Sequence, residues 1–168
     1  MCSSDLSGPA APSVGRVRKT LLVAAFVAVA ALLLVPRGRD TPTVRADPQL
    51  TPGALNPDVT QATIDSTICI SGWTKTVRPP VSYTNGLKLQ QMRDYAETGS
   101  PSNYQEDHFI SLELGGDPTD PRNLWPEPYP RAGEVDRIEN ELNADVCSGR
   151  LSLAEAQRRE AELKWSRG

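Results

Sequence analysis

Histidine and cysteine, which are frequent zinc ligands, are scarce in this 168-residue chain. His108 is the only histidine, and the three cysteines are Cys2, Cys69 and Cys147. These residues lie far apart in the sequence, so the spacing of a structural zinc site does not occur. Internal repeats are also absent, and a repeat architecture is therefore not expected.

A run of about 20 apolar residues, the length needed to span a membrane, is missing as well. The longest uncharged apolar run covers residues 20–35, and a basic cluster that ends at Lys19 precedes it. This order is typical of a secretory signal peptide, and Ala46 offers a small residue for cleavage. An uncleaved, transmembrane signal anchor is the alternative. In both cases residues 1–46 engage the secretion machinery or the membrane, and the remainder lies outside the cytoplasm.

A basic surface is the third feature that the sequence lacks. The chain has 18 Lys and Arg against 21 Asp and Glu, and six of the basic but two of the acidic residues precede residue 47. Residues 47–168 therefore carry a net charge of −7. Proteins that bind nucleic acid usually present basic residues to the phosphates. The one local basic group here is more typical of a solvated face, and it consists of Lys75, Arg78, Lys88 and Arg93.

The predicted organisation has three parts. Residues 1–46 form the signal segment, residues 47–59 a linker rich in Pro and Thr, and residues 60–168 one small domain. Apolar spacing predicts that this domain is mostly helical. The expected elements are a short helix or turn at 60–69, an irregular or extended segment at 72–80, a helix at 84–96, a helix from about residue 132 that Gly149 ends, and a last helix opened by a capping box at 152–155.

Cys69 and Cys147 remain as a pair once Cys2 is set aside with the signal segment. Exported thiols are normally oxidised, so the sequence favours a disulfide between them. Closing a loop of this length stabilises the fold by about 4 kcal/mol in the chain-entropy model, and a domain of this size needs such support. Two free thiols packed as small apolar residues are the alternative.

The residues with recognisable chemistry gather in one stretch, residues 106–127 (EDHFISLELGGDPTDPRNLWPE). Asp107 and His108 are adjacent, so on a strand their side chains point to opposite faces, whereas on a bent strand end both can reach one site. A Gly-Gly pair then allows a tight turn, and a polar loop leads to Asn123. The pattern predicts two short extended segments around a long turn, followed by a helix, in the order β-β-α. The Asp-His pair alone is more often an ordinary polar pair than a site.

Together, the Asp-His pair, the Gly-Gly turn and the asparagine resemble the core of the HNH, or ββα-metal, nuclease family. The resemblance implies that Asp107 ligates a metal ion, that His108 is the general base, and that Asn123 closes the turn and helps orient the histidine. It extends to an uncharacterised subfamily of small secreted bacterial proteins. The implied fold is a small, mostly helical α+β domain that contains a ββα-metal unit.

The chain departs from the family pattern at two positions. Ser111 stands where the family commonly has proline, which removes no chemistry. The third metal ligand, usually His or Asn, should fall at residues 131–133, where no ligand occurs. Glu134 and Asp136 follow directly on the next helix as candidate ligands, and Asp136 is the better of the two. Glu113 is either a supporting group for the site or an exposed residue, and we favour the structural interpretation.

We therefore expect a secreted or membrane-anchored, metal-dependent nuclease that hydrolyses phosphodiester bonds of DNA or RNA, with nucleic acid as its partner. One divalent cation, Mg²⁺ before Mn²⁺ or Zn²⁺, would act as a Lewis acid while His108 deprotonates the attacking water. The alternative is a non-catalytic secreted or envelope binding protein on a degenerate HNH scaffold. The missing third ligand and the acidic charge favour this alternative.

Overall fold

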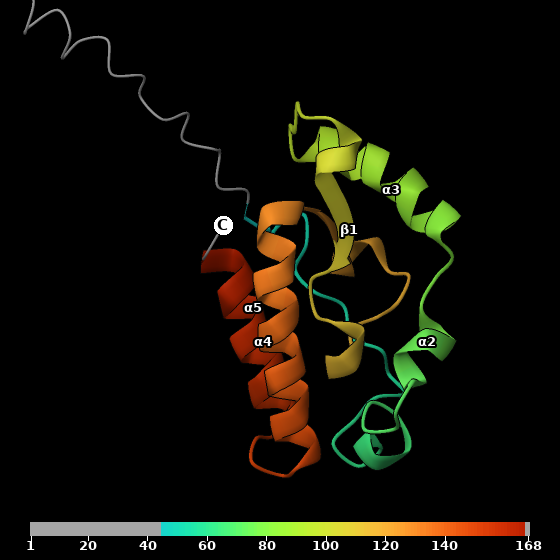
Figure 1. Ribbon diagram of the computed structural model, residues 1–168, viewed down its shortest axis with the longest axis vertical. Helices are drawn as coiled ribbons and strands as arrows, with labels where there is room; N and C mark the ends of the chain where they lie inside the picture. The colour runs from blue at the N-terminus through green and yellow to red at the C-terminus, as the bar shows by residue number, and fades with distance from the viewer. Residues whose placement is uncertain (1–44, 167–168) are drawn as a thin grey trace, which may run out of the picture. The chain divides into compact units, whose positions relative to one another are not determined.

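The computed structural model describes residues 45–166, and Figure 1 shows how their elements are arranged. In this part the chain forms four α-helices and one two-stranded antiparallel sheet, which confirms the predicted mixture of helix and strand. No helix within these residues is long and apolar enough to cross a membrane. The apolar run at 20–35, predicted to be a signal peptide or anchor, lies outside the described residues.

The helices are α2 (Trp73–Val77), α3 (Val81–Asp94), α4 (Tyr129–Cys147) and α5 (Leu153–Ser166). The last three correspond to predicted helices, although α3 and α4 begin three residues earlier than expected. Helix α2 corrects the expectation of an irregular or extended segment at 72–80. The prolines that follow it, Pro79 and Pro80, exclude a strand ladder but do not prevent a short helix that ends before them.

The sheet pairs β1 (Tyr104–His108) with β2 (Leu124–Pro128), and His108 lies opposite Leu124. Residues 109–123 form the loop between the strands, and α4 follows β2 directly. The order β-β-α expected from the sequence is therefore present. Two prolines lie in β2, which a two-stranded sheet tolerates because each strand has one edge without ladder hydrogen bonds.

The hydrophobic core lies between the loop, the sheet and the α4–α5 pair, whose helices pack side by side (Figure 1). Phe109, Leu114 and Trp125 are completely buried, and they belong to one cluster with Val146 of α4 and Ala156 of α5. Burying each large apolar side chain contributes about 1.5–3 kcal/mol. This packing fixes the loop and the end of β1 against the two helices.

The segment predicted to be a linker, residues 47–59, instead packs on the domain. The backbone N–H of Gly53 donates to the carbonyl of Arg122 at 3.0 Å, and that of Asn56 donates to the carbonyl of Gly115 at 2.9 Å. An irregular segment rich in Pro and Thr can thus satisfy its backbone groups with a second irregular segment in place of water. The folded domain therefore begins before the predicted boundary.

The predicted disulfide between Cys69 and Cys147 is confirmed, with 5.5 Å between the two Cα atoms. It joins the segment before α2 to the last residue of α4 across 78 positions of sequence. For a loop of this size the chain-entropy model gives a stabilisation of about 4 kcal/mol. The bridge therefore links α4 to the part of the chain that carries α2.

Candidate functional site

Asp107 and His108 are the last two residues of β1, and their side chains enter different environments. The Asp107 carboxylate meets Lys164 of α5, with 3.0 Å between Oδ2 and Nζ. The His108 ring lies against the loop, where Nε2 is 3.0 Å from the carbonyl oxygen of Pro118. Alternation along the strand thus separates the two side chains, and the alternative of a bent strand end at which both reach one site is not what the structure shows.

His108 is almost completely buried, with 4% of its surface exposed. Burial lowers the pKa of the imidazole, although the Pro118 carbonyl and Asp107 act in the opposite direction. The ring is therefore neutral at pH 7. Because a carbonyl oxygen only accepts, Nε2 carries the proton in this bond and Nδ1 is the basic nitrogen. A general base must contact the water that it deprotonates, and the buried His108 ring is shielded from solvent in this structure.

Asn123 holds the two ends of the loop together through its completely buried side chain. Its Oδ1 accepts from the N–H of Ile110 at 2.9 Å, and its Nδ2 donates to the carbonyls of Ile110 at 3.0 Å and Asp117 at 2.9 Å. A Cβ on Gly116 would lie 1.8 Å from the Ile110 carbonyl oxygen, so only glycine fits there. Asn123 closes the turn, and these bonds connect it to His108 only through the loop backbone.

Lys164 lies at the centre of a group of acids and is completely buried. Its Nζ is 2.6 Å from Glu139 Oε1, 3.0 Å from Asp107 Oδ2 and 3.3 Å from Glu160 Oε1. It also donates to the carbonyl of His108 at 2.6 Å. Burial alone would lower the pKa of Lys164, but the surrounding carboxylates raise it well above its ordinary value. Burial would likewise raise the pKa of Asp107, and the Lys164 charge instead holds it below its usual range.

Carboxyl groups outnumber bases in this region. Glu127 is completely buried, with Arg131 Nε 3.7 Å from its Oε1. Burial and the charge of Asp107 raise the pKa of Glu127 to about 9. Burial also raises the pKa of Glu139 and of Glu160. Some of these carboxyls therefore keep a proton at pH 7, which lets several acids share one ammonium. We name this group the Lys164 cluster, which comprises Asp107, Glu127, Glu139, Glu160 and Lys164.

Lys164 is not among the residues that the motif predicts for the site, although the sequence contains a signal for it. Leu153, Ala156, Glu160 and Lys164 follow one another at helical spacing, and all four are buried in α5. An acid and a base thus occupy the buried stripe of the helix, where apolar residues are expected. Charged residues are rarely buried unless they are paired, so this pattern indicates a buried ion pair.

The structure does not gather the predicted metal ligands around one point. Glu134 is exposed on α4. Asp136 is close enough to Asp107 for that charge, together with burial, to raise its pKa. Between Asp107 and Glu139 of α4, the Lys164 ammonium takes the position that a cation would need. In the described part of the chain, no three His, Cys, Asp or Glu side chains are arranged to hold a metal ion. This donor set does not fit a resident divalent ion, which requires several oxygen ligands.

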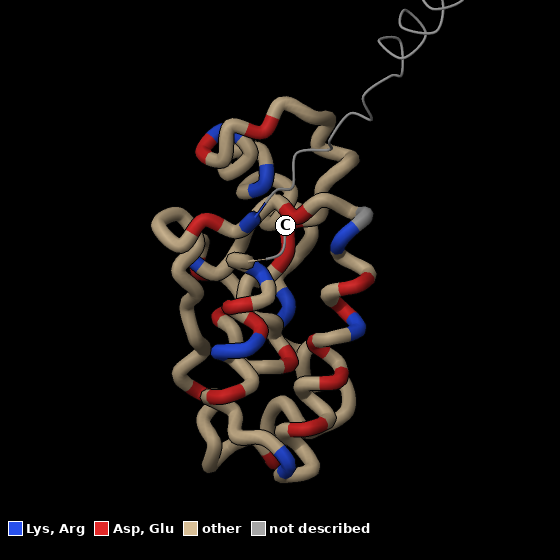
Figure 2. Tube along the Cα trace, turned by 90° about the vertical axis from the view of Figure 1, so that its left-hand side faces the viewer, with Lys and Arg blue, Asp and Glu red and all other residues tan. Residues whose placement is uncertain are grey.

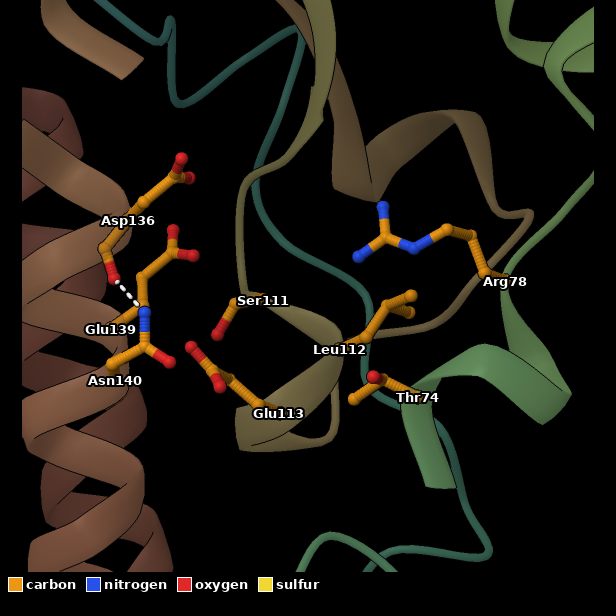
Figure 3. Close-up of a pocket in the computed structure, with 8 residues that line it drawn as sticks. All are labelled: Thr74, Arg78, Ser111, Leu112, Glu113, Asp136, Glu139 and Asn140. Carbon is orange, nitrogen blue, oxygen red and sulfur yellow. Dashed lines mark hydrogen bonds between the residues drawn. The ribbon is translucent and has the colours of Figure 1, made fainter. Parts of the chain in front are cut away.

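A pocket of about 280 Å³ lies beside the Lys164 cluster, between α2, the loop and α4 (Figure 3). Figure 3 shows Asp136 and Glu139 on the α4 side, Arg78 on the opposite side, and Ser111 and Glu113 between them. Burial raises the pKa of Glu113 to about 7, and the charges of Glu139 and Asp136 contribute. Glu113, for which we favoured a structural interpretation, thus places its carboxyl group at a pocket. We name this cavity the acidic pocket.

Basic side chains are dispersed among acidic ones along the trace, and Figure 2 shows no continuous basic stripe in its view. Three residues of the local basic group noted in the sequence make contacts in different places. Arg78 lines the acidic pocket. Lys88 donates to the carbonyl of Tyr104 at 2.9 Å, and Arg93 donates to the carbonyl of Leu89 at 2.7 Å. These contacts do not form a surface that tracks phosphates.

Comparison of the chain with protein-family models, with curated proteins and with solved structures finds no match. The fold and the site define a class by themselves: a small disulfide-linked domain of helices and one two-stranded sheet, with a closed ion cluster beside an acidic pocket. The function therefore has to follow from the chemistry of these two features.

Proposed function

We propose that this chain is an extracytoplasmic binding domain in which the β1–β2–α4 unit serves as a scaffold. The observation that carries the proposal is the completely buried Lys164, whose Nζ lies 3.0 Å from Asp107 and 2.6 Å from Glu139. The residue predicted to hold a metal ion is thus neutralised by the protein's own cation. The residue predicted to act as general base, His108, is buried beside it.

The energetics of the Lys164 cluster oppose metal binding at Asp107. A divalent ion would have to displace the ammonium, and breaking a buried ion pair typically costs about 3–5 kcal/mol. Mg²⁺ in addition gives up its water reluctantly and requires nearly octahedral oxygen ligands. Lys164 therefore keeps its position at Asp107, and the neighbouring acidic pocket is the place where a ligand can bind.

The extracytoplasmic location rests on two independent features. Disulfides such as the one between Cys69 and Cys147 form and persist mainly in oxidising surroundings. The apolar run at 20–35, with the basic residues before it, is typical of export. Both features support a domain that functions outside the cytoplasm.

The test measures divalent-ion binding and nucleic-acid hydrolysis by the oxidised full chain. Calorimetric titration with Mg²⁺ or Mn²⁺ should show no binding that is lost in Asp107→Asn under conditions where circular dichroism shows this variant to be folded. Plasmid DNA and RNA should remain intact with either ion, as they do with chelator. Hydrolysis that requires a divalent ion and disappears in His108→Ala would overturn the proposal.

A metal-dependent nuclease is the second candidate, and the order of the elements favours it. Strand β1 ends in Asp107-His108, Asn123 closes the loop, and β2 leads directly into α4, as the resemblance to HNH nucleases implies. In this candidate the neutral His108 accepts a proton from water through Nδ1. Lys164 would have to leave Asp107, and the loop would have to expose the ring, when nucleic acid binds.

This candidate predicts that His108→Ala keeps the fold and loses about 10²- to 10⁴-fold in the rate of hydrolysis. The measurement is cleavage of plasmid DNA and RNA by wild type and variant at equal concentration, with circular dichroism as the control for folding. Equal rates in both proteins would exclude His108 as the base and remove the nuclease candidate.

A further inference from the structure

The acidic pocket presents charges of both signs across one cavity. Glu113 and Asp136 point their carboxyl groups into it, and Arg78 faces them from the other side (Figure 3). Arg78 is near enough to lower the pKa of both acids, although burial and the other carboxylates raise them overall. Figure 3 marks one hydrogen bond among the residues drawn, from Asn140 Nδ2 to the backbone carbonyl of Asp136 at 2.6 Å. The opposed charges therefore do not satisfy one another.

Ser111 provides an independent sign that a polar group belongs in this pocket. Its side chain lines the cavity, and the residue is 5% exposed. Its hydroxyl oxygen is buried and has no hydrogen-bond partner among the described residues. Figure 3 shows this hydroxyl pointing toward α4, on the same side as the Glu113 carboxyl group. Buried polar groups are nearly always hydrogen-bonded, so a hydroxyl without a protein partner at the wall of a pocket leaves one bonding position for a ligand group.

The charges select the chemistry of this ligand. An anion alone would be repelled by Glu113 and Asp136, and a cation alone would be repelled by Arg78. A divalent metal ion needs more oxygen ligands, in closer arrangement, than the described side chains supply. A molecule that carries one ammonium and one carboxylate can pair with the acidic side of the pocket and with Arg78 at the same time. The ammonium would donate hydrogen bonds to the acids and to Ser111, and the carboxylate would accept from the guanidinium.

We propose that the acidic pocket binds a small zwitterion of amino-acid size, with its ammonium at Glu113, Asp136 and Ser111 and its carboxylate at Arg78. The volume of about 280 Å³ lies just below the range that accommodates drug-sized ligands, which limits the ligand to a few heavy atoms. This inference rests on the proposed function, because it names the ligand class of the binding domain.

The first experiment titrates the oxidised full chain with ligands matched in size. Glycine, β-alanine and 4-aminobutyrate vary the distance between ammonium and carboxylate, while n-butylamine and butyrate each keep one of the two charges. By calorimetry and by amide chemical shifts, one zwitterion should bind at least about tenfold more tightly than either single-charge compound, because a charge-assisted hydrogen bond is lost in each. Equal binding of n-butylamine and the zwitterions would overturn the proposal, and so would the absence of binding by all of them.

The second experiment changes the two walls of the pocket separately. Glu113→Gln and Arg78→Gln should each weaken binding of the zwitterion by about tenfold or more. Glu141→Gln is the matched control, because Glu141 lies on α4 and is exposed in an ion pair with Arg137. Affinity unchanged in the two pocket variants would overturn the proposal. Displacement of the zwitterion by Ca²⁺ or Mg²⁺, with loss of ion binding in Glu113→Gln, would identify a metal site instead.

Failure here and failure of the proposed function are distinguishable. Nucleic-acid hydrolysis that depends on His108 would overturn the scaffold interpretation, whatever the pocket binds. An inert chain that binds no zwitterion would overturn only the ligand assignment.

Discussion

Two groups of acidic side chains lie next to each other in this domain, and they differ in how their charge is neutralised. The Lys164 cluster has a buried ammonium 2.6–3.3 Å from three of its acids, Asp107, Glu139 and Glu160. In the acidic pocket, the lining basic side chain is Arg78, on the side opposite α4. Glu139 belongs to both groups, so the two groups are adjacent and their position in the fold does not explain the difference in neutralisation. In our proposal, the acidic residues near the predicted catalytic motif stabilise the fold in the cluster and bind a ligand in the pocket.

Burial explains why the two groups differ. A carboxylate out of contact with water requires a partner or a proton, and the cluster uses both, because Lys164 is charged and the pKa of Glu127 is raised to about 9. Asp136 lies at an exposed position on α4, where water partly solvates its charge. Partial solvation permits an acid without a fixed partner, and such an acid is available to bind a ligand. The contrast can be tested by removing a charge from each side of it.

Lys164→Met should have the largest effect. The change leaves Asp107 and Glu139 buried without their ammonium, which typically costs about 3–5 kcal/mol of unfolding free energy. Urea denaturation of the oxidised protein at pH 7 measures it. Lys75→Met is the control, since Lys75 is exposed on α2 and its substitution should stay within about 0.5 kcal/mol. A Lys164→Met protein as stable as this control would mean that the cluster does not stabilise the fold.

Much of the fold could be predicted from the sequence because local patterns specify it. Apolar spacing from about residue 132 to Gly149 predicted α4, the capping box at 152–155 predicted α5, and the expectation of export predicted the pairing of Cys69 with Cys147. Each of these patterns depends on neighbours in sequence or on the compartment. The β-β-α order followed in the same way from a turn flanked by two short segments.

The environment of the site could not be predicted, because it depends on contacts between distant elements. Asp107 and Lys164 are separated by 57 positions, and only the packing of α5 against the end of β1 brings them together. The segment at 47–59 likewise reads as a linker until the loop supplies partners for its backbone. A motif therefore located the residues of interest, while the fold determined whether a cation of the chain or a ligand faces them.

The pH dependence of stability sharpens the comparison through Glu127. Burial and the Asp107 charge raise its pKa to about 9, so the folded protein keeps a proton that the unfolded chain releases near its ordinary pKa of 4.5. The contribution of the protonated Glu127 to the free energy of unfolding is therefore fully present below pH 4.5, and it is lost as the pH rises toward 9. Glu127→Gln should therefore raise the unfolding free energy at pH 9 by about 1 kcal/mol or more, and change it little at pH 5.

Denaturation of wild type and Glu127→Gln at pH 5, 7 and 9 measures this difference. Asp107, Lys164 and Arg131 face Glu127 in both proteins, so their own titration largely cancels in the comparison. Glu141→Gln, which changes an exposed acid, should leave the pH dependence of wild type intact. Identical slopes for Glu127→Gln and wild type would show that Glu127 titrates normally in the fold.

The smallest effect is expected where a charge is removed from the pocket side. Asp136→Asn should change the unfolding free energy by no more than about 0.5 kcal/mol at pH 7, because Asp136 is exposed and its carboxylate has no ion-pair partner among the described residues. Above pH 4 the variant should be slightly the more stable protein, since burial and the Asp107 charge raise the pKa of Asp136 and so make its ionised form unfavourable.

Asp107→Asn is the matched change on the cluster side, and it should destabilise strongly because Lys164 loses a partner. If the two Asp→Asn variants lose equal stability in urea, the division between a structural cluster and a ligand pocket fails; if only Asp107→Asn unfolds readily, Asp136 is free to serve binding.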